Sequence, residues 1–379
     1  MSSIWDVAIA GAGPAGAVAA LILARAGRRV LLLDDVGPGA TKIGESLPGA
    51  ARRLLNDLGL LPVVDRAPHL PCYGNLAAWG SDQLVATDFI RDPYGPGWHL
   101  DRARFDADLR TAAMAAGASY RIARIEKATW TGRRWQAALR NGEKVEAMWL
   151  IDATGRRARI ARQQGAHRCR DDGLVALYTW AVSGPGDTDT RTLIEAVPYG
   201  WWYTARLPDG ARIVALHVDA KDAIAILHDP RGFESKLAET IHLRPLFEGR
   251  QFLTKARGTE AGGARLDRFM GLGWLAAGDA ALSFDPLSSQ GIFAALYTGM
   301  RAGQAVVGAL SGNTIGLEAY NARLDSIRTA YLSQHRRQYQ MERRWPKHEF
   351  WLERGAQSGG LDNAELMLGH QFMKTGRHS

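Results

Sequence analysis

Several features are scarce in this chain of 379 residues, and each absence excludes a class of protein. The two cysteines, Cys72 and Cys169, show no CxxC spacing and no clustered histidines, which argues against a metal site and a disulfide scaffold. No run of eighteen apolar residues is present, so no membrane span is expected. Residues 7–33 are interrupted by glycine, arginine and proline and do not have the pattern of a signal peptide. We therefore expect a cytoplasmic protein without a metal site.

Lysine is also scarce, because only eight of the 47 basic residues are lysines. Arginine therefore supplies most of the net charge of +8, which reflects either a compositional bias or a surface for phosphates, an acidic substrate or an acidic partner. No long basic run and no nucleic-acid-binding motif accompanies this charge. The compositional explanation is favoured, and nucleic acid is not expected as a partner.

The N-terminal segment has the pattern of a strand, a tight turn, a helix and a second strand. We expect the strands over residues 4–10 and 30–33 and the helix over residues 15–26, which Gly27 is well placed to end. A helix that joins two neighbouring strands in this way requires a parallel sheet. A further buried strand is expected over residues 273–277.

The turn between the first strand and the helix has the sequence GAGPAG, residues 11–16. Gly11 allows a tight turn, Gly13 lets the backbone approach a diphosphate, and Gly16 lets the helix pack closely on the strand. The helix N-terminus would present N–H groups to the phosphates, and Asp34 can accept both ribose hydroxyls. An ordinary glycine-rich turn is the alternative, but the correct order of strand, helix, strand and acid favours a bound dinucleotide.

A second segment, residues 271–291, indicates which dinucleotide is bound. Its sequence, GLGWLAAGDAALSFDPLSSQG, predicts a buried strand that ends in Gly278 and Asp279, then a loop that enters a helix near Gly291. Asp279 can accept a ribityl hydroxyl, and the helix N-terminus would stabilise negative charge on a flavin. The predicted cofactor is therefore FAD. No second GxGxxG unit is present, so the expected reductant is transiently bound NAD(P)H or a partner flavin reductase.

The rest of the chain predicts further helices and an antiparallel sheet. Helices are expected over residues 50–58, from about Arg102, and from Leu317 to about Arg354, before a frayed tail. Alternating segments with hairpin signals at Asn141-Gly142 and Pro208-Asp209-Gly210 predict antiparallel strands over residues 120–151 and 176–218.

We predict an α/β fold in which a Rossmann-like FAD/NAD(P)-binding fold carries an antiparallel-sheet substrate domain and a helical C-terminal region. The FAD-binding domain is expected to be discontinuous. Its predicted segments are residues 1–70, 98–165 and 266–315; those of the substrate domain are 71–97 and 166–265; and the C-terminal segment is 316–379.

Five ordered motifs resemble those of flavoproteins with the p-hydroxybenzoate hydroxylase fold, and more narrowly the branch of flavin-dependent halogenases and related hydroxylases. They are DVAIAGAGPAGAVAALILARAGRRVLLLD, KIGESLPGAARRLLNDLGL, HLDRARFDADL, LIDATGRRARIAR and GDAALSFDPLSSQG. The resemblance implies that Arg102 contacts the phosphate or ribityl part of FAD and that Ser46 and Pro48 lie beside the isoalloxazine ring. Together, the expected FAD contacts are Gly11, Gly13, Pro14, Ala15, Gly16, Asp34, Lys42, Ser46, Arg102, Gly278, Asp279, Pro286, Ser289, Gln290 and Gly291.

The resemblance also bears on the chemistry. Tryptophan halogenases use a lysine after the GES-P segment to handle hypohalous acid, whereas this chain has no lysine between Lys42 and Lys127. The matching stretch, CYGNLAAWGS, offers Asn75, Trp79 and small residues, none of which carries an ammonium. The glutamate of the halogenase DPL-ST-G loop is replaced by Ser288, and the Trp-x-Trp-x-Ile-Pro signature is absent. The sequence therefore favours hydroxylation over halogenation.

The expected reaction is attack by a flavin hydroperoxide on an electron-rich ring, which needs a dry pocket and correct placement. Glu45 and His99 are candidates for orienting the substrate or moving a proton, and Trp79 is a candidate catalytic aromatic. The alternative for His99 is a loop histidine with satisfied hydrogen bonds, and for each aromatic it is core packing. The aromatic residues expected to line the pocket are Tyr73, Trp79, Trp98, Trp201, Trp202 and Tyr203.

The segment YLSQHRRQYQMERRWPKHEFWLER, with KIGESLPG and CYGN, resembles flavoprotein maturases that hydroxylate tryptophan in partner proteins. Those partners are precursors of quinone-cofactor (CTQ/TTQ-type) oxidases or dehydrogenases, so the resemblance implies a protein or peptide substrate. Alternatively, this segment is a basic helix that covers the flavin domain. Three other functions remain open: hydroxylation of a free aromatic or indolic metabolite, reduction of isoprenoid double bonds, and a non-catalytic flavin-binding role as a chaperone.

Overall fold

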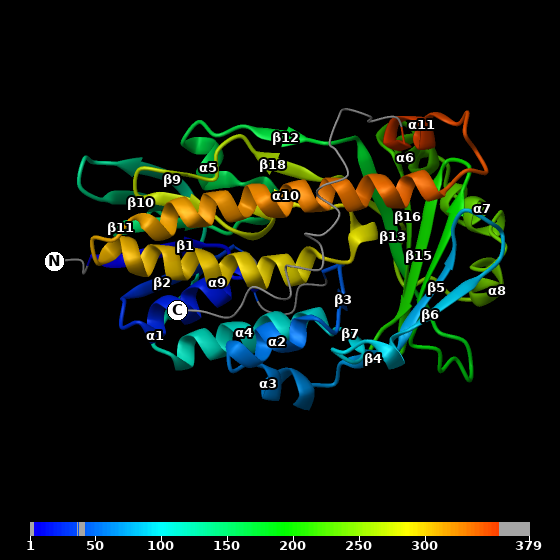
Figure 1. The fold of residues 1–379 in the computed structure, drawn as a ribbon, viewed down its shortest axis with the longest axis horizontal. Helices are drawn as coiled ribbons and strands as arrows, with labels where there is room; N and C mark the ends of the chain where they lie inside the picture. The colour runs from blue at the N-terminus through cyan, green and yellow to red at the C-terminus, as the bar shows by residue number, and fades with distance from the viewer. Residues whose placement is uncertain (1–3, 36, 38–41, 356–379) are drawn as a thin grey trace.

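The computed structural model describes residues 4–35, 37 and 42–355. Figure 1 shows an elongated molecule with one large sheet and most of the helices at one end and a second large sheet at the other. The long helices α9 (Gly291–Leu310) and α10 (Ile315–Met341) lie along the first part, and α10 continues to the second sheet. This arrangement confirms the predicted α/β fold with a Rossmann-like sheet and a helical C-terminal region.

The first sheet has eight strands, and its core is parallel. Its order is β19-β20-β11-β1-β2-β8, with β10 paired to β11 and β9 to β10. Strands β20, β11, β1, β2 and β8 pair in parallel, as the strand-turn-helix-strand pattern predicted. The strands are β1 Trp5–Ala10, β2 Val30–Asp34, β8 Ser119–Ile122, β9 Ile125–Trp130, β10 Trp135–Leu139, β11 Lys144–Asp152, β19 Met270–Gly271 and β20 Trp274–Ala276.

Helix α1 (Pro14–Arg25) follows the glycine turn and packs against α9. The two helices approach closely because α9 carries Gly299 at the crossing: a Cβ there would lie 2.3 Å from the carbonyl oxygen of Ala15. The other helices of this part are α2 Ala51–Asp57, α3 Leu61–Arg66, α4 Arg102–Ala115 and α5 Arg159–Gln163, with short 3₁₀ turns η2 Gly155–Arg157, η3 Gly278–Ala280 and η4 Pro286–Ser288.

The second large sheet has seven strands in the order β17-β13-β16-β15-β14-β5-β6. Its pairs are antiparallel except β14 with β5, which run parallel. Both predicted hairpin turns are confirmed, since residues 140–143 connect β10 to β11 and residues 207–210 connect β15 to β16. The strands are β5 Gly74–Ala78, β6 Val85–Asp88, β13 Leu174–Val182, β14 Thr192–Val197, β15 Gly200–Arg206, β16 Ala211–Asp219 and β17 Arg257–Glu260.

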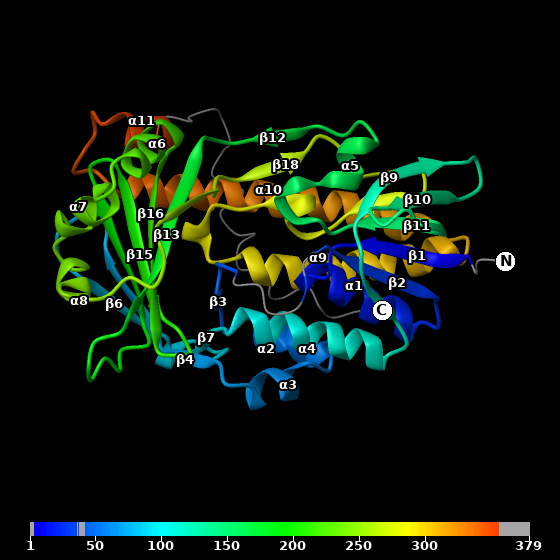
Figure 2. The same cartoon turned by 180° about the vertical axis from the view of Figure 1, so that it is seen from behind.

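Each face of the seven-stranded sheet covers a separate hydrophobic cluster. The outer face carries Trp202 and Leu216 and packs under the short helices (Figures 1 and 2). The inner face carries Trp201 and packs against Leu287 of η4 and the C-terminal helices. The outer face is covered by α6 Ala220–His228, α7 Gly232–Ala238 and α8 Arg244–Phe247, and the inner face by α10 and α11 Glu349–Gly355. A short 3₁₀ turn, η1 Phe89–Arg91, follows β6.

Two three-stranded sheets connect the large ones. One has the order β3-β7-β4 (Ser46–Leu47, Gly97–His99, Leu70–Cys72), and the other has β12-β18-β21 (Arg168–Arg170, Ala264–Leu266, Leu282–Ser283). The predicted C-terminal helical stretch is two helices, because residues 342–348, with Pro346, interrupt it. The predicted frayed tail lies outside the described residues. None of the helices in the described ranges is long and apolar enough to cross a membrane.

Candidate functional site

The glycine turn contains two glycines that the fold itself requires and one that it does not. Gly11 has a φ of +100°, and a Cβ on it would lie 2.1 Å from the Ala153 oxygen; a Cβ on Gly16 would lie 1.9 Å from the Gly11 oxygen. A Cβ on Gly13 would meet nothing within 4 Å. Helix α1 then begins at Pro14 without a capping side chain or an acidic residue in its first turn. The space at Gly13 and the uncapped helix fit an approaching diphosphate.

Asp34 is placed to support this turn. It ends β2, is 8% exposed, and its Oδ2 accepts a hydrogen bond from the Ala12 N–H at 3.1 Å. The carboxylate therefore holds the backbone of the glycine turn at the end of the parallel strands. Ribose binding by Asp34 stays a prediction.

The second motif meets the first although the two are far apart in sequence. Gly278 has a φ of +61°, and a Cβ on it would lie 2.8 Å from the Cβ of Ala15 in α1. The neighbouring Asp279 has a side chain that is 37% exposed and lies 3.8 Å from the Arg156 Nε. Partial burial raises the pKa of Asp279, while the charges of Arg156 and Arg168 oppose that rise. One half-exposed carboxylate thus lies beside the glycine turn, where a ribityl hydroxyl is expected.

Helix α9 offers a second open N-terminus. Its first turn has no capping side chain and no acidic residue, and a Cβ on Gly291 would meet nothing within 4 Å. The preceding loop is held by Asp285, which accepts the Leu287 N–H at 2.8 Å, and it ends in Ser289 with a φ of +51°. Gln290 is exposed at the start of the helix. The free N–H groups there can stabilise an electron-rich ring edge.

Lys42 and Arg102 hold the strap, which we define as residues 42–47. The Lys42 Nζ lies 2.8 Å from Asp106 Oδ2 on α4, and Arg102 lies 3.3 Å from the same carboxylate. Arg102 also donates to the carbonyl of Ile43 at 3.0 Å and to that of Gly44. Both cations therefore fasten the strap to α4, and their contact with FAD stays a prediction.

The candidate Glu45 is buried between the strap and the seven-stranded sheet. It is 4% exposed and accepts a short hydrogen bond from the Tyr203 hydroxyl on β15. Burial raises the pKa of Glu45; burial together with this carboxylate raises the pKa of Tyr203 well above its ordinary value. Tyr203 belongs to the same cluster as Leu287 of η4. The pair thus lies where the strap, η4 and the inner sheet face meet, which are the segments expected to surround the flavin ring.

The candidate His99 is 0% exposed, and both of its ring nitrogens have partners. Nδ1 lies 3.1 Å from the Arg206 carbonyl oxygen, and Nε2 lies 3.0 Å from the Thr192 hydroxyl. Because a carbonyl oxygen only accepts, Nδ1 carries the proton and Nε2 accepts from Thr192. Burial lowers the pKa of His99 to about 4, so the ring is neutral near pH 7. A role of His99 in substrate orientation or proton movement stays a prediction.

Trp79 lies within the inner aromatic cluster. Its Nε1 donates to the Gln338 carbonyl at 2.8 Å, and its ring packs edge-on against Trp201 and Trp351, with centroids 6.4 and 5.3 Å away. Trp201 in turn stacks on His217 at 3.6 Å. These contacts give Trp79 a packing role, and a catalytic role stays a prediction.

The prediction that Trp202 lines the pocket is wrong. Its side chain lies on the outer face and packs against Phe233, because neighbouring residues of a strand point to opposite faces. The inner face instead carries two partly buried aromatics that the sequence did not single out, Tyr178 and Trp180, in a T-shaped pair 5.4 Å apart. Tyr178 and Tyr203 both pair with Ala215 and so point to the same face. The alternation within β13 was the signal that could have found them.

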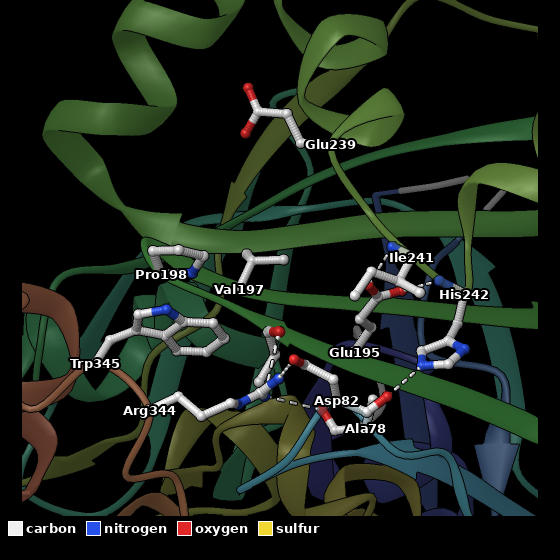
Figure 3. A pocket seen from close by; sticks show the side chains of 11 residues that line it. Ala78, Asp82, Glu195, Val197, Pro198, Glu239, Ile241, His242, Arg344 and Trp345 are labelled. Atoms are coloured by element: carbon white, nitrogen blue, oxygen red, sulfur yellow. Dashed lines mark hydrogen bonds and ion pairs between the residues drawn. The ribbon is translucent and has the colours of Figure 1, made fainter.

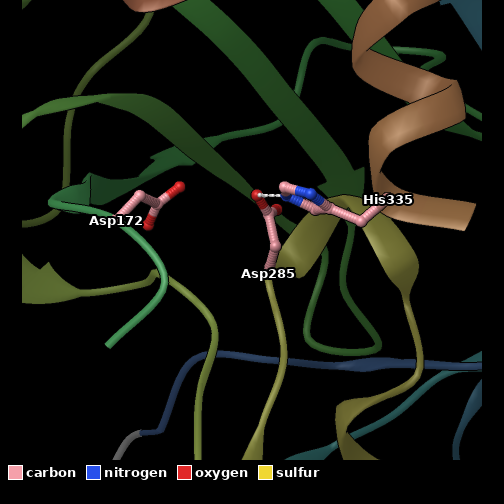
Figure 4. Close-up of side chains that lie close together, drawn as sticks. All are labelled: Asp172, Asp285 and His335. Atoms are coloured by element: carbon pink, nitrogen blue, oxygen red, sulfur yellow. Dashed lines mark hydrogen bonds and ion pairs between the residues drawn. The ribbon is translucent and has the colours of Figure 1, made fainter. Parts of the chain in front are cut away.

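A buried polar network ties α10 to η4, and the sequence did not reveal it. Asp285 pairs with His335 at 3.0 Å, and Asp172 lies close by (Figure 4). Asp285 also accepts from Tyr339 at 2.8 Å, and Asp172 pairs with Arg354. Burial alone would raise the pKa of Asp285, but these hydrogen bonds lower it below its ordinary value. The side-chain oxygen and nitrogen atoms of Asp172, Asp285 and His335 that could bind a metal ion lie within 4.8 Å of one another. Both carboxylates already pair with side chains of the protein, so we assign the three residues to anchoring η4 rather than to a metal site.

A small cavity of about 90 Å³ lies at one end of β5 and β14 (Figure 3). Glu195, which lines it, accepts three backbone N–H groups at 2.6 to 3.0 Å, and Arg344 pairs with Asp82 and Glu342. The cavity is smaller than the ~300 Å³ typical of small-molecule sites. Glu195 and Arg344 already have hydrogen-bond and ion-pair partners within the protein. We therefore assign the residues around this cavity a structural role.

Three features together fit an FAD molecule that extends from the glycine turn to the strap. They are the open glycine turn, the adjacent Gly278-Asp279 and the open N-terminus of α9. The chain is accordingly an FAD-dependent oxidoreductase.

It belongs to the tryptophan halogenase family, whose model matches residues 84–362. Among its relatives is a protein of Marinomonas mediterranea named putative FAD-dependent oxidoreductase LodB, which is 30% identical over 368 residues, or 93% of this chain and 97% of the relative. A 1H-pyrrole-2-carbonyl-[peptidyl-carrier protein] brominase of Pseudoalteromonas luteoviolacea is 26% identical over 82% of this chain and 79% of its own.

Two solved structures show how widely the fold is shared. The myxobacterial chondrochloren halogenase CndH has a TM-score of 0.85 at 23% identity and covers 98% of this chain and 89% of its own. The peptidyl tryptophan dihydroxylase QhpG has a TM-score of 0.72 at 23% identity and covers 93% of this chain and 79% of its own. At this level of identity the two structures establish the fold alone.

Proposed function

We propose that the chain is an FAD-dependent monooxygenase that hydroxylates a tryptophan side chain of a partner protein or peptide, in the maturation of a protein-derived quinone cofactor. The observation that carries this proposal is the set of groups beside the expected flavin position. A carboxyl-phenol pair, the buried Glu45 and the partly buried Tyr203, lies there, whereas the Lys42 ammonium is paired with Asp106 on α4. With Lys42 held by Asp106, the described residues of the strap offer no free ammonium of the kind with which tryptophan halogenases handle hypohalous acid, and this favours oxygen transfer.

The inner sheet face suits an electron-rich ring. Tyr178 and Trp180 present partly buried aromatic surfaces, and Leu287 adds an apolar contact from η4. Such a surface binds an indole and excludes water from the reaction. Reduced FAD, once bound, would supply activated oxygen; NAD(P)H or a partner flavin reductase is the proposed source of its electrons.

One structural neighbour supports a substrate within a polypeptide. QhpG, which shares the fold, is described as a peptidyl tryptophan dihydroxylase essential for tryptophylquinone cofactor biogenesis. The relative LodB is named a putative FAD-dependent oxidoreductase, a name that is compatible with oxygen transfer and specifies no substrate. Hydroxylation of a free indolic metabolite is the alternative, because the brominase and halogenase relatives leave a small-molecule or carrier-bound substrate open.

The test uses the FAD-loaded full chain with NADH, a flavin reductase and ¹⁸O₂. A tryptophan peptide and free indoles are supplied separately, each with and without bromide. The proposal predicts that the peptide gains ¹⁸O and that bromide changes nothing. A brominated product would contradict oxygen transfer, and labelling of free indoles alone would contradict the polypeptide substrate. Trp180→Leu should raise KM for the peptide, whereas the outer-face control Trp202→Phe should not, because Trp202 is buried away from the inner face.

A further inference from the structure

The hydrogen-bonded pair Glu45–Tyr203 has a second buried pair near it, in which the Thr192 hydroxyl lies 3.0 Å from His99 Nε2. Glu45, Thr192 and His99 are at most 4% exposed, whereas Tyr203 is partly exposed. Of these four residues, Tyr203 is therefore the one that a ligand on the inner sheet face can reach. The other three lie behind it, out of contact with solvent.

The direction of the hydrogen bonds follows from counting protons. His99 donates from Nδ1 to the Arg206 carbonyl, so its Nε2 must accept the proton of the Thr192 hydroxyl. The Thr192 oxygen can then accept weakly from the Cys72 thiol at 3.9 Å. Tyr203 has one proton, which it donates to the Glu45 carboxylate. If Glu45 gains a proton, the carboxyl group can donate to the Tyr203 oxygen instead.

We infer that Tyr203 is a catalytic proton-transfer residue and that Glu45 is the base behind it. This inference deepens the proposed function and rests on it for the identity of the substrate. Reduced FAD and O₂ are the co-reactants that place oxygen on the ring.

The proton step balances in the following way. When the oxygenated ring carbon loses its hydrogen as a proton, the C–H electron pair returns to the ring and restores its aromaticity. The released proton passes to the Tyr203 oxygen as the Tyr203 proton moves to Glu45. The step ends with Tyr203 neutral and Glu45 protonated, and the Glu45 carboxyl group then donates a hydrogen bond to the Tyr203 oxygen. No tyrosinate has to form in the buried site, since Tyr203 stays neutral throughout.

The surroundings of the Glu45–Tyr203 pair suit proton transfer. Burial raises the pKa of Glu45, which brings it closer to the pH at which a carboxylate is an effective base; the hydrogen bond from Tyr203 and the charge of Arg102 oppose the rise. Burial, assisted by the charge of Arg212, keeps His99 neutral, so its Nε2 remains an acceptor for Thr192. Burial also raises the pKa of Cys72, which keeps its thiol protonated.

Infrared titration of the full chain before FAD loading tests the pair without turnover. The protonated-carboxyl band that disappears in Glu45→Gln belongs to Glu45. In Tyr203→Phe its titration midpoint should move to higher pH, because the hydrogen bond that stabilises the carboxylate is lost. Trp202→Phe, next to Tyr203 but on the outer face, is the matched control and should leave the midpoint in place. An unchanged midpoint in Tyr203→Phe would overturn the inference.

Turnover of the FAD-loaded chain gives the second measurement. Glu45→Gln and Tyr203→Phe should each lower kcat by about 100-fold and leave KM and FAD affinity unchanged, as expected for loss of a proton-transfer group. The limb of the pH profile that reports the base should disappear in Glu45→Gln. Wild-type kcat in either variant would overturn the inference. If the wild-type protein transfers no oxygen, the proposed function fails, and the infrared titration alone decides whether Tyr203 and Glu45 act as a proton-sharing pair.

Discussion

Replacing Gly13 by alanine separates cofactor binding from folding. A Cβ on Gly13 would meet nothing within 4 Å, and its φ of −74° is accessible to alanine. The FAD-free chain should therefore keep its free energy of unfolding to within about 0.5 kcal/mol. If the diphosphate approaches this backbone, the added methyl group stands in its path. Overpacking of this kind costs about 1–3 kcal/mol, which is roughly a 5- to 150-fold increase in the Kd for FAD.

Two further glycines serve as controls. Gly173 also has nothing within 4 Å of a Cβ, so Gly173→Ala should change neither stability nor FAD affinity. Gly16→Ala should destabilise the FAD-free chain, because its Cβ would lie 1.9 Å from the Gly11 oxygen. Urea denaturation and titration of flavin fluorescence measure the two quantities. Wild-type FAD affinity in Gly13→Ala would refute the placement of the diphosphate at this turn.

Three other perturbations test the fold. Arg354→Met removes the cation that pairs with two largely buried aspartates, and should lower the free energy of unfolding by about 3–5 kcal/mol in urea titrations; a change below ~1 kcal/mol would contradict this. Burial lowers the pKa of His99 and His217 to about 4, so the unfolded chain binds more protons between pH 6.5 and 4. Stability should fall on acidification through that window by on the order of 3 kcal/mol per histidine, and His99→Gln should flatten the slope. A thiol reagent should modify Cys169 in the folded chain and reach Cys72 only after unfolding, since Cys169 is exposed and Cys72 buried.

The sequence determined those parts of the protein that depend on neighbouring residues. The glycine turn, the helix after it and the hairpins at residues 140–143 and 207–210 could be predicted because local backbone preferences and short-range alternation decide them. The order of the motifs was enough to predict the class of cofactor. The single break in the C-terminal helix was missed, although Pro346 signals it.

Only the tertiary structure decided which distant residues share the site. Glu45 comes from the strap and Tyr203 from β15, and no spacing in the sequence relates them. Their contact depends on the register of β14, β15 and β16, which also turns Trp202 away from the site and brings Tyr178 onto the Tyr203 face. A shift of one residue would exchange the two faces of a strand, and packing across the whole sheet fixes that register. The GAGPAG turn could therefore be predicted from the sequence alone, whereas the residues beside the expected flavin position could be identified only from the tertiary structure.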